Sequence, residues 1–402
     1  MELIDRILDA RQCLDGFIEK TPVLHAHALA PSATQFFLKA ENLQTTGSFK
    51  LRGAYYRISR LTEAEKASGV IACSAGNHAQ GVALSASREG IKCVICMPEG
   101  APLSKVERTR AYGAEVVLCP GVYDDAYARA MELQRECGYT FIHPFDDLDV
   151  IAGQGTIGLE IMEQIPDLDM VLVPIGGGGI LSGIACAIKA YAPQCKVYGV
   201  EPVGAACMKL SIDTGGICIL PTVSTMADGI AVKQPGKETF ALCCQYVDGF
   251  VCVNENEIAS AMLALMEDYK VVAEGAGAAA VAAAMYQKVD VQGKTVCSIL
   301  SGGNVDVNVI ALIIAKGLKQ TGRVMDVSVV LWDKPRQLRN MLDIVGNEGA
   351  NILSVRHERD NSDIDVGKCL VSLKLETRGH DHATYIQQVL KDRGYAVYSA
   401  SL

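Results

Sequence analysis

The sequence has little that suits a nucleic-acid or membrane partner. Acidic side chains outnumber basic ones by 46 to 37, the formal net charge is −9, and no basic run reverses this balance. Phosphate backbones require clustered positive charge, so we expect no nucleic-acid partner. The longest apolar stretch, 275–286, is rich in Ala and Gly and is shorter than the ~20 residues that cross a bilayer. We therefore expect no membrane span.

Secretion and zinc signals are also missing. The start, MELIDRILDARQ, has no apolar core of a signal peptide, which predicts a cytoplasmic protein. The 15 cysteines are then expected to be reduced. Cys93 and Cys96 form a CxxC pair inside the apolar run KCVICMP, but no second CxxC or His pair completes a zinc site. We expect this pair to be structural.

What the sequence does contain is a regular alternation of strand and helix patterns. A chain of 402 residues exceeds one ordinary core, so two or three domains are expected. The alternation predicts an α/β fold with parallel sheets covered by helices on both faces, and ligands then bind at loops that follow strands. The predicted strands are 36–40, 69–73, 91–97, 114–119, 170–175, 196–201 and 295–301, and the predicted helices are 49–60, 79–89, 103–112, 126–136 and 180–191.

The pattern changes after the polar segment KQTGRV, 319–324. The following residues read as strand, helix, two strands, helix and strand, which is the order of a ferredoxin-like domain. The predicted elements are strands 326–332, 351–359, 368–377 and 395–401 and helices 335–345 and 383–392.

Two motifs place reactive groups at the start of a predicted helix. In GSFKLRGA, Lys50 follows a Gly/Thr-rich loop, where an amine can face a cleft and form a Schiff base; a solvated lysine is the alternative. In CSAGNHAQG, small residues let backbone N–H groups approach an anion at a helix N-terminus. Asn77 adds a donor and an acceptor, whereas His78 is more typical of a packed residue.

Two further motifs follow predicted strands. The four glycines of IGGGGILSG form a backbone nest for a phosphate, and the motif is neither GxGxxG nor a Walker A loop. In ILSGGNVD, Ser301 ends a strand, where its hydroxyl can hydrogen-bond a ring atom of a ligand.

In this order and spacing, SFKLRGA, SAGNHAQG, GGGG and SGGN resemble the threonine dehydratases of the fold type II (β-family) pyridoxal-phosphate enzymes. The resemblance covers residues 5–318, and the chain from about residue 326 resembles an ACT regulatory domain. It implies a two-domain α/β fold like the tryptophan synthase β chain. The implied division is a catalytic domain at 1–318 with a smaller subdomain at about 45–145, a linker at 319–325 and an ACT domain at 326–402.

The resemblance also implies a role for each motif. Lys50 would hold pyridoxal 5'-phosphate and act as the catalytic base, Phe49 would pack beside the ring, and Asn77 would bond the ring hydroxyl oxygen. Ser301 would contact the pyridine nitrogen. The phosphate would bind Gly176, Gly177, Gly178 and Gly179, and the substrate carboxylate would lie among Ser74, Ala75, Gly76 and Asn77.

A serine at the pyridine nitrogen should leave the ring neutral, which favours loss of a β-leaving group over transamination. We therefore expect deamination of L-threonine to 2-oxobutanoate and ammonia, and of L-serine to pyruvate. The alternatives are a serine racemase, a β-replacement enzyme and a non-catalytic amino-acid sensor. Ala75 argues against the racemase, because related racemases carry a second serine base there. No second-substrate site is evident for replacement, and the intact motifs argue against a sensor.

Two segments depart from the relatives. In EPVGAAC, Cys207 replaces an acid expected at a divalent-cation site, and magnesium and calcium prefer oxygen ligands, so we expect no metal. In DKPRQL, which resembles the ligand loop of ACT domains, Arg336 stands where relatives usually have Gly, while Asn351 fits the pattern. The C-terminal unit is expected either to bind an amino-acid or nucleotide effector or only to mediate assembly. We expect a homotetramer, with a homodimer as the alternative.

Overall fold

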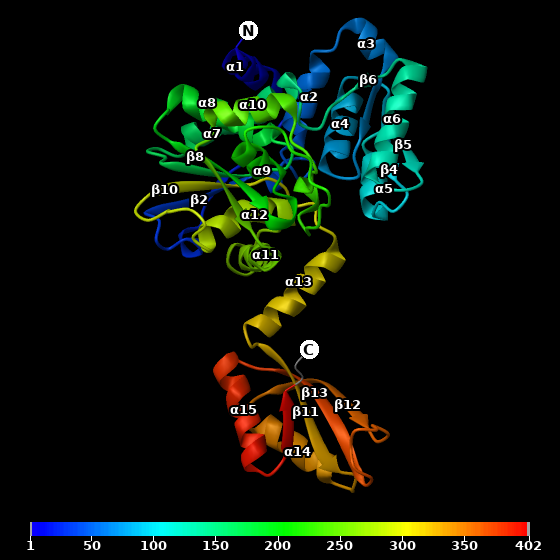
Figure 1. Ribbon diagram of the computed structural model, residues 1–402, viewed down its shortest axis with the longest axis vertical. Helices are drawn as coiled ribbons and strands as arrows, with labels where there is room; N and C mark the ends of the chain where they lie inside the picture. Colours follow the sequence, from blue (N-terminus) through cyan, green and yellow to red (C-terminus); the bar gives the residue numbers. More distant parts are fainter. Residues whose placement is uncertain (1, 400–402) are drawn as a thin grey trace. The chain divides into compact units, whose positions relative to one another are not determined.

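The computed structural model describes residues 2–399, which divide into two compact units. The first unit ends at Asp306 and the second begins at Val307 (Figure 1). This boundary precedes residue 318, the predicted end of the catalytic domain, because helix α13 (Val307–Gln320) belongs to the second unit. The predicted linker, 319–325, contains the end of this helix, a turn and the start of strand β11 (Val324–Trp332).

The larger sheet of the first unit has the strand order β1-β2-β10-β7-β8-β9. All its pairings are parallel except that of β1 with β2. Figure 1 shows α8 and α10 on one side of this sheet and α12 on the other, so the apolar strands are buried on both faces as predicted. The strands are β1 (Val23–His25), β2 (Gln35–Ala40), β7 (Met170–Pro174), β8 (Lys196–Pro202), β9 (Gly249–Val253) and β10 (Thr295–Leu300).

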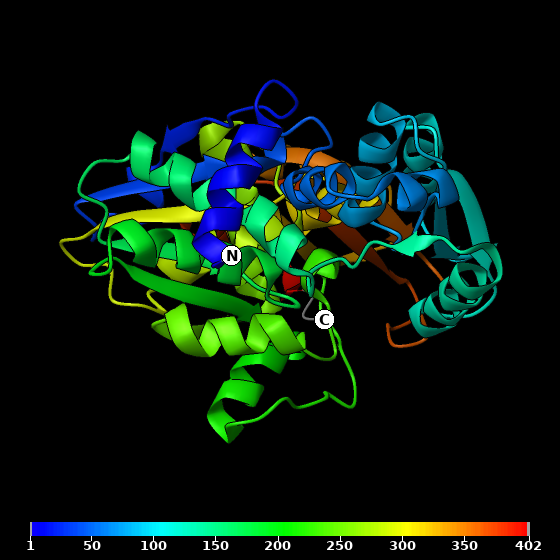
Figure 2. The same cartoon turned by 90° about the horizontal axis from the view of Figure 1, so that it is seen from above.

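In the part of the chain that the structure describes, seven α-helices accompany this sheet. Helix α1 packs on α7 and α8 through Ile7 and Ala10, and Figure 2 shows it lying across them. The helices are α1 (Leu3–Leu14), α7 (Leu148–Gln164), α8 (Gly179–Tyr191), α9 (Cys207–Thr214), α10 (Lys237–Tyr246), α11 (Glu255–Tyr269) and α12 (Gly275–Met285).

The smaller sheet has the order β5-β4-β3-β6 and is entirely parallel. Alternate residues of β3 and β4 enter two different apolar clusters, one shared with α4 and the other with α6. Cys93 and Cys96 of β4 belong to opposite clusters, so their thiols lie on opposite faces and the CxxC pair cannot bind one metal. The elements are β3 (Val70–Cys73), β4 (Cys93–Pro98), β5 (Glu115–Cys119), β6 (Thr140–Phe141), α2 (Lys50–Ser59), α3 (Glu63–Ser68), α4 (Asn77–Arg88), α5 (Leu103–Ala111) and α6 (Tyr123–Cys137).

The second unit confirms the predicted β-α-β-β-α-β order. Its antiparallel sheet has the order β12-β13-β11-β14, and helices α14 and α15 share one apolar core with alternate strand residues. The elements are α14 (Gln337–Asn347), β12 (Asn351–Glu358), β13 (Lys368–Glu376), α15 (His380–Asp392) and β14 (Ala396–Ser399). The last two residues of the predicted final strand, 400 and 401, lie outside the described residues.

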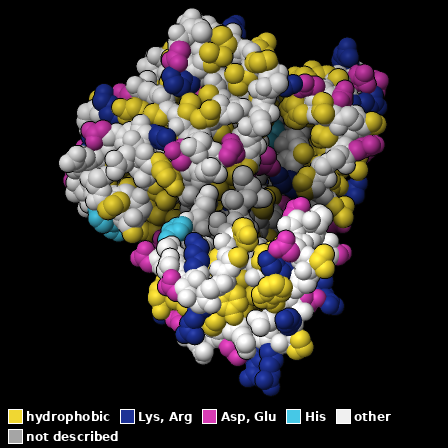
Figure 3. All heavy atoms as spheres, turned by 60° about the horizontal axis from the view of Figure 1, so that its bottom comes forward, with side chains coloured by type: hydrophobic (Ala, Val, Ile, Leu, Met, Phe, Trp, Pro, Cys, Tyr) yellow, Lys and Arg dark blue, Asp and Glu magenta, His cyan; other side chains and the backbone are white. Residues whose placement is uncertain are grey.

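The surface carries charges of both signs. On the face drawn in Figure 3, Lys and Arg side chains are interspersed with Asp and Glu rather than gathered by sign. Across the described residues, no helix combines the length and apolarity that a bilayer crossing needs.

Candidate active site

The tetraglycine loop joins the end of β7 to the start of α8. Gly178 has φ = 104°, a conformation that side chains rarely adopt. A Cβ on Gly177 would overlap the ring of Phe145, and one on Gly178 would lie 2.7 Å from the Thr239 Cβ. Only glycine therefore fits, and the loop presents its backbone at a helix N-terminus, where N–H groups and the helix dipole favour an anion.

Lys50 is the first residue of α2. Its Nζ donates to the Pro144 carbonyl oxygen at 2.8 Å and lies 5.2 Å from the centre of the Phe49 ring. Pro144 immediately precedes Phe145, so the amine lies close to the tetraglycine loop. Burial lowers the pKa of Lys50 to about 8, although the Glu274 carboxylate opposes this change. An amine that loses its proton near this pH can act as a nucleophile or a base.

Asn77, the first residue of α4, joins two distant segments. Its Nδ2 donates to Glu274 Oε1 at 2.6 Å, and its Oδ1 accepts from Asn304 Nδ2 at 2.8 Å. The same Asn304 nitrogen donates to the Thr46 carbonyl oxygen at 2.7 Å. Burial, followed by the neighbouring Asp228 charge, raises the pKa of Glu274 to about 7. A carboxyl group that titrates near neutrality is therefore held at the start of α12.

Ser301 directly follows β10 and is buried. Its carbonyl oxygen accepts from the Phe49 N–H at 3.1 Å. The next residue, Gly302, is so close to Asn77 that a Cβ there would lie 3.1 Å from Asn77 Nδ2. The structure thus brings Ser301, Phe49 and Asn77 together with Lys50, at the carboxyl ends of strands from both sheets.

The loop between β3 and α4 contains the remaining predicted residues. Ser74, Ala75 and Gly76 are partly exposed, whereas the strand before them is buried. The Gly76 N–H donates to Ser74 Oγ at 3.2 Å, and the space where a Gly76 Cβ would lie is open. This loop leads into the N-terminus of α4, so an incoming carboxylate can meet backbone N–H groups there.

Three groups of the site are not among the residues predicted from the sequence: the Glu274 carboxyl, the Asn304 amide and the Pro144 carbonyl. Glu274 is the lone acid in the otherwise apolar run from Val271 to Tyr286, and an isolated acid of this kind is a signal that could have identified it. Asn304 lies inside the SGGN motif, from which only Ser301 was selected. The Pro144 carbonyl is a backbone group and leaves no sequence signal.

Three other side chains that the sequence singled out are packed into the fold. His78 Nε2 donates to the Ile142 carbonyl oxygen at 2.8 Å, and burial lowers the pKa of His78 to about 3, so the ring is neutral. Glu201 is buried and accepts from the N–H groups of Met208 and Lys209 at 2.9 and 2.8 Å, which caps helix α9. Cys207 is buried, and its thiol lies 3.9 Å from the Gly176 carbonyl oxygen.

Comparison with known proteins agrees with this geometry. L-threonine ammonia-lyase of Thermotoga maritima is 48% identical over 398 residues, which are 99% of this chain and 99% of that protein. The processed threonine deaminase isoform 2 of Solanum lycopersicum has a similar structure, with a TM-score of 0.74, 39% identity and coverage of 78% of this chain and 92% of the other. Maize serine racemase also has a similar structure, with a TM-score of 0.74, 34% identity and coverage of 79% of this chain and 98% of the other.

The family model described as "Pyridoxal-phosphate dependent enzyme" matches residues 14–302, a range that contains the tetraglycine loop, Lys50, Asn77 and Ser301. The chain therefore belongs to the pyridoxal-phosphate-dependent enzymes.

Proposed function

We propose that this protein deaminates L-threonine to 2-oxobutanoate and ammonia, and L-serine to pyruvate. The observation that carries the proposal is the placement of Lys50. Its amine has a lowered pKa, a neutral carbonyl as its hydrogen-bond acceptor and a glycine nest close by. The Thermotoga maritima relative, named for the same activity, supports the choice of substrate.

The residues present fit pyridoxal phosphate. The tetraglycine loop suits the phosphate, Lys50 suits the aldehyde, and Phe49 and Ser301 lie beside one another where a ring can be held. Two buried polar atoms near these residues, Ser48 Oγ and Gln80 Nε2, have no hydrogen-bond partner among the described residues. Buried polar groups are normally satisfied, so a polar ligand is the expected partner for them.

When bound, pyridoxal phosphate supplies an electron sink for the charge that develops at the substrate Cα. The chain's residues then have separate tasks. The loop from Ser74 to Gly76, with the N-terminus of α4, holds the substrate carboxylate. The neutral amine of Lys50 removes the Cα proton, which its pKa of about 8 permits near neutral pH. The Ser301 hydroxyl cannot compensate a positive charge on the pyridine nitrogen as a carboxylate would. A neutral ring favours rapid loss of the substrate's β-hydroxyl.

The reaction balances without an oxidant or a further substrate. Threonine loses its Cα proton and its β-hydroxyl as one water, which leaves an enamine. The released enamine takes up one water and separates into 2-oxobutanoate and ammonia. The same steps convert serine to pyruvate and ammonia.

A serine racemase is the second candidate, since maize serine racemase has a similar structure. Racemisation needs a proton donor on the face opposite the lysine. In this chain Ala75 follows Ser74 in the substrate loop, and its methyl group packs partly against the core of the smaller sheet. A methyl group transfers no proton, so deamination is the favoured outcome.

We also propose that the second unit is an ACT domain that binds an amino-acid or nucleotide effector near the loop 333–338, and that the enzyme is a cytoplasmic homotetramer, with a homodimer as the alternative. The first four residues of the predicted ligand loop lie between β11 and α14, and Gln337 and Leu338 begin α14. Sedimentation with and without candidate effectors tests both assembly and binding.

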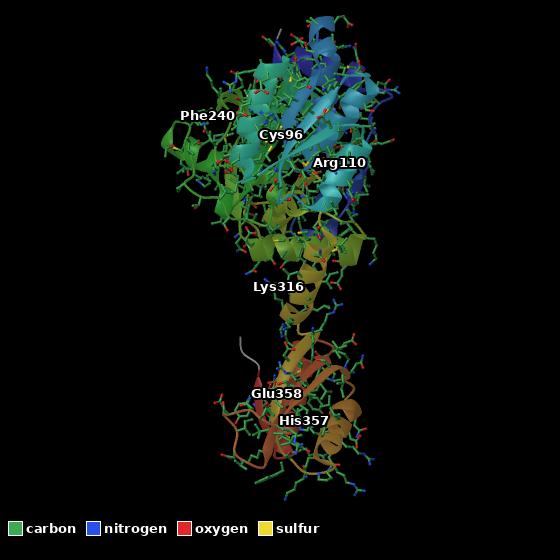
Figure 4. The ribbon with its side chains drawn as sticks, turned by 90° about the vertical axis from the view of Figure 1, so that its right-hand side faces the viewer. Cys96, Arg110, Phe240, Lys316, His357 and Glu358 are labelled. Atoms are coloured by element: carbon green, nitrogen blue, oxygen red, sulfur yellow. The ribbon has the colours of Figure 1, made fainter. Side chains whose placement is uncertain are left out.

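Turnover by the purified protein tests the proposed function. The wild-type chain, loaded with pyridoxal phosphate, should release 2-oxobutanoate and ammonia from L-threonine in equal amounts. Lys50→Ala should release neither. Lys316→Ala, which changes an exposed lysine of α13 (Figure 4), should match the wild type. Formation of D-allothreonine from L-threonine, or of D-serine from L-serine, without keto acid would replace this proposal with the racemase.

A further inference from the structure

Three side chains of the kinds that bind metals lie together in the second unit, and one of them, Asp333, is the first residue of the loop 333–338. Among the described residues, Asp333, His357 and Cys369 form the one group of three His, Cys or acidic side chains whose ligand atoms all lie within 4.8 Å of one another. They come from different segments: Asp333 follows β11, His357 is on β12 and Cys369 is on β13. Figure 4 labels His357.

The sheet register explains why these side chains converge. His357 is paired with Val371, and Cys369 is paired with Leu331. Directly paired residues point to the same face, as do residues two apart along a strand. Val371, Cys369 and Leu331 are all buried in the core shared with α14 and α15. His357 and Cys369 therefore lie on one face, and Asp333, two residues beyond Leu331, continues the same line.

The three side chains differ in their exposure to solvent. Cys369 is buried, Asp333 is partly exposed and His357 is exposed. The thiol thus lies at the bottom of the cluster, and the imidazole can move to close it from the solvent side. This arrangement gives an ion a route of entry while the thiol of Cys369 stays fixed on its strand.

Asp333 is already paired with Arg359, but the pairing leaves an oxygen for a metal. Two of the three Arg359 side-chain nitrogens, Nε and Nη2, contact the same carboxylate oxygen, Oδ2, at 2.6 and 2.5 Å. Neither contact uses Oδ1, and the Arg359 side chain is 71% exposed, so it can move away from an arriving cation. The guanidinium otherwise orients the carboxylate.

We propose that Asp333, His357 and Cys369 form a site for Zn²⁺ or a chemically similar divalent transition metal. A thiolate, an imidazole and a carboxylate are the three kinds of ligand that zinc prefers, whereas magnesium and calcium select oxygen alone. Three protein ligands leave a fourth tetrahedral position for water or for another small ligand. The bound ion would tie the segment after β11 to β12 and β13. This site is independent of the proposed catalytic function.

Metal titration of the full-length protein tests the proposal. Chelator-treated, cofactor-loaded protein is titrated with Zn²⁺ against a chromogenic chelator, and with Co²⁺ while absorption is recorded. We expect one ion per chain at this site and a near-ultraviolet band from thiolate-to-cobalt charge transfer. His357→Ala and Cys369→Ser should each weaken binding by about 100-fold or more, because each removes a direct ligand. His357 is exposed, so its removal leaves the core intact.

Matched controls separate this site from other metal-binding groups. Cys244→Ser changes an exposed thiol of α10, and His27→Ala changes an exposed imidazole; both should bind as the wild type does. Glu201→Gln should also leave the cobalt thiolate band unchanged. Wild-type protein without that band, or His357→Ala with unchanged zinc affinity, would overturn the proposal. Deamination is not used as a readout, so failure here leaves the proposed function untouched.

Discussion

Lys39 and Lys50 both belong to the first unit, and their surroundings differ: Lys39 is buried, whereas Lys50 is partly buried. Lys39, on β2, donates to the Glu160 carboxylate, to the Thr21 carbonyl oxygen at 2.7 Å and to Gln164 Oε1 at 2.9 Å. Lys50 donates to one neutral carbonyl oxygen, that of Pro144. Burial lowers the pKa of both lysines, but at Lys39 the carboxylates of Glu160 and Glu41 oppose it from close range. Lys39, whose ammonium group has three hydrogen-bond acceptors, one of them a carboxylate, supports the fold. Lys50, whose amine has a single neutral acceptor, remains available for chemistry.

The same contrast exists within the SFKLRGA motif. Arg52 lies two residues after Lys50 and is fully buried, with ion pairs to Glu41 at 2.8 Å and to Glu160 at 2.6 Å. Together with Lys39, these side chains form a network of two cations and two anions. One short motif therefore supplies both the proposed cofactor lysine and a structural charge cluster close to it.

The largest effect on stability is expected from breaking that network. Arg52→Ala should lower the free energy of unfolding by about 3–5 kcal/mol, because it leaves the carboxylates of Glu41 and Glu160 with one cation, Lys39, instead of two. Urea unfolding of the cofactor-free chain measures the change. Arg129→Ala removes an exposed pair with Glu132 and should change stability by less than about 1 kcal/mol. Equal losses in the two variants would show that the network is not structural.

A carboxylate near Lys50 provides the second test. Glu274→Gln keeps an oxygen that can accept from Asn77 but removes the charge, so we expect kcat to fall on the order of 100-fold while KM changes little. A carboxyl group with a pKa of about 7 can exchange protons at neutral pH, and an amide cannot. Steady-state kinetics across a range of pH measure both constants. Unchanged kcat and an unchanged pH profile would leave Glu274 with a structural role.

The lowered pKa of Lys50 predicts how cofactor capture depends on pH. Only the neutral amine attacks an aldehyde, so the rate at which the cofactor-free chain captures pyridoxal phosphate should rise with pH and level off above about pH 8. The pKa of Lys50 is lowered because burial disfavours the protonated amine, so the neutral amine is present at lower pH than in an exposed lysine. Stopped-flow absorbance measures the rate. A rate that keeps rising toward pH 10 would indicate an ordinary lysine.

The smallest effect is expected in the second unit. Arg336 has φ = 74°, a left-handed conformation that is strained for a side chain with a Cβ. Arg336→Gly should therefore raise the free energy of unfolding by about 1 kcal/mol. The neighbouring change Arg339→Ala, at an exposed site, should stay within about 0.5 kcal/mol of the wild type. A destabilised Arg336→Gly would show that the arginine side chain makes a compensating contact.

These regions also show how far the sequence could be interpreted. The apolar strands were predicted within a few residues because burial on both faces gives continuous apolar runs, as in β7. Helix α4 begins at Asn77 rather than at residue 79, since the polar motif itself forms the first turn. The contact between Asn77 and Glu274 joins residues that are 197 positions apart, and no local pattern encodes it.

The C-terminal unit shows the same limits. Its strand and helix order followed from periodicity, because β11 and β13 alternate buried and less buried residues and each helix has one apolar face. The convergence of Asp333, His357 and Cys369 depends on the register of β11, β12 and β13, which cannot be derived from the sequence pattern. Arg336 was noticed only as a departure from a glycine pattern, and the backbone angle supplies the physical reason.

The central claim, that Lys50 and not Lys39 carries the cofactor, can be tested by borohydride reduction of the pyridoxal-phosphate-loaded protein followed by peptide mass spectrometry. Reduction fixes the cofactor on the lysine to which it is bound. We predict that the phosphopyridoxyl mass is found on the peptide that contains Lys50. The mass on a peptide with Lys39 or any other lysine, or on none, would contradict the account.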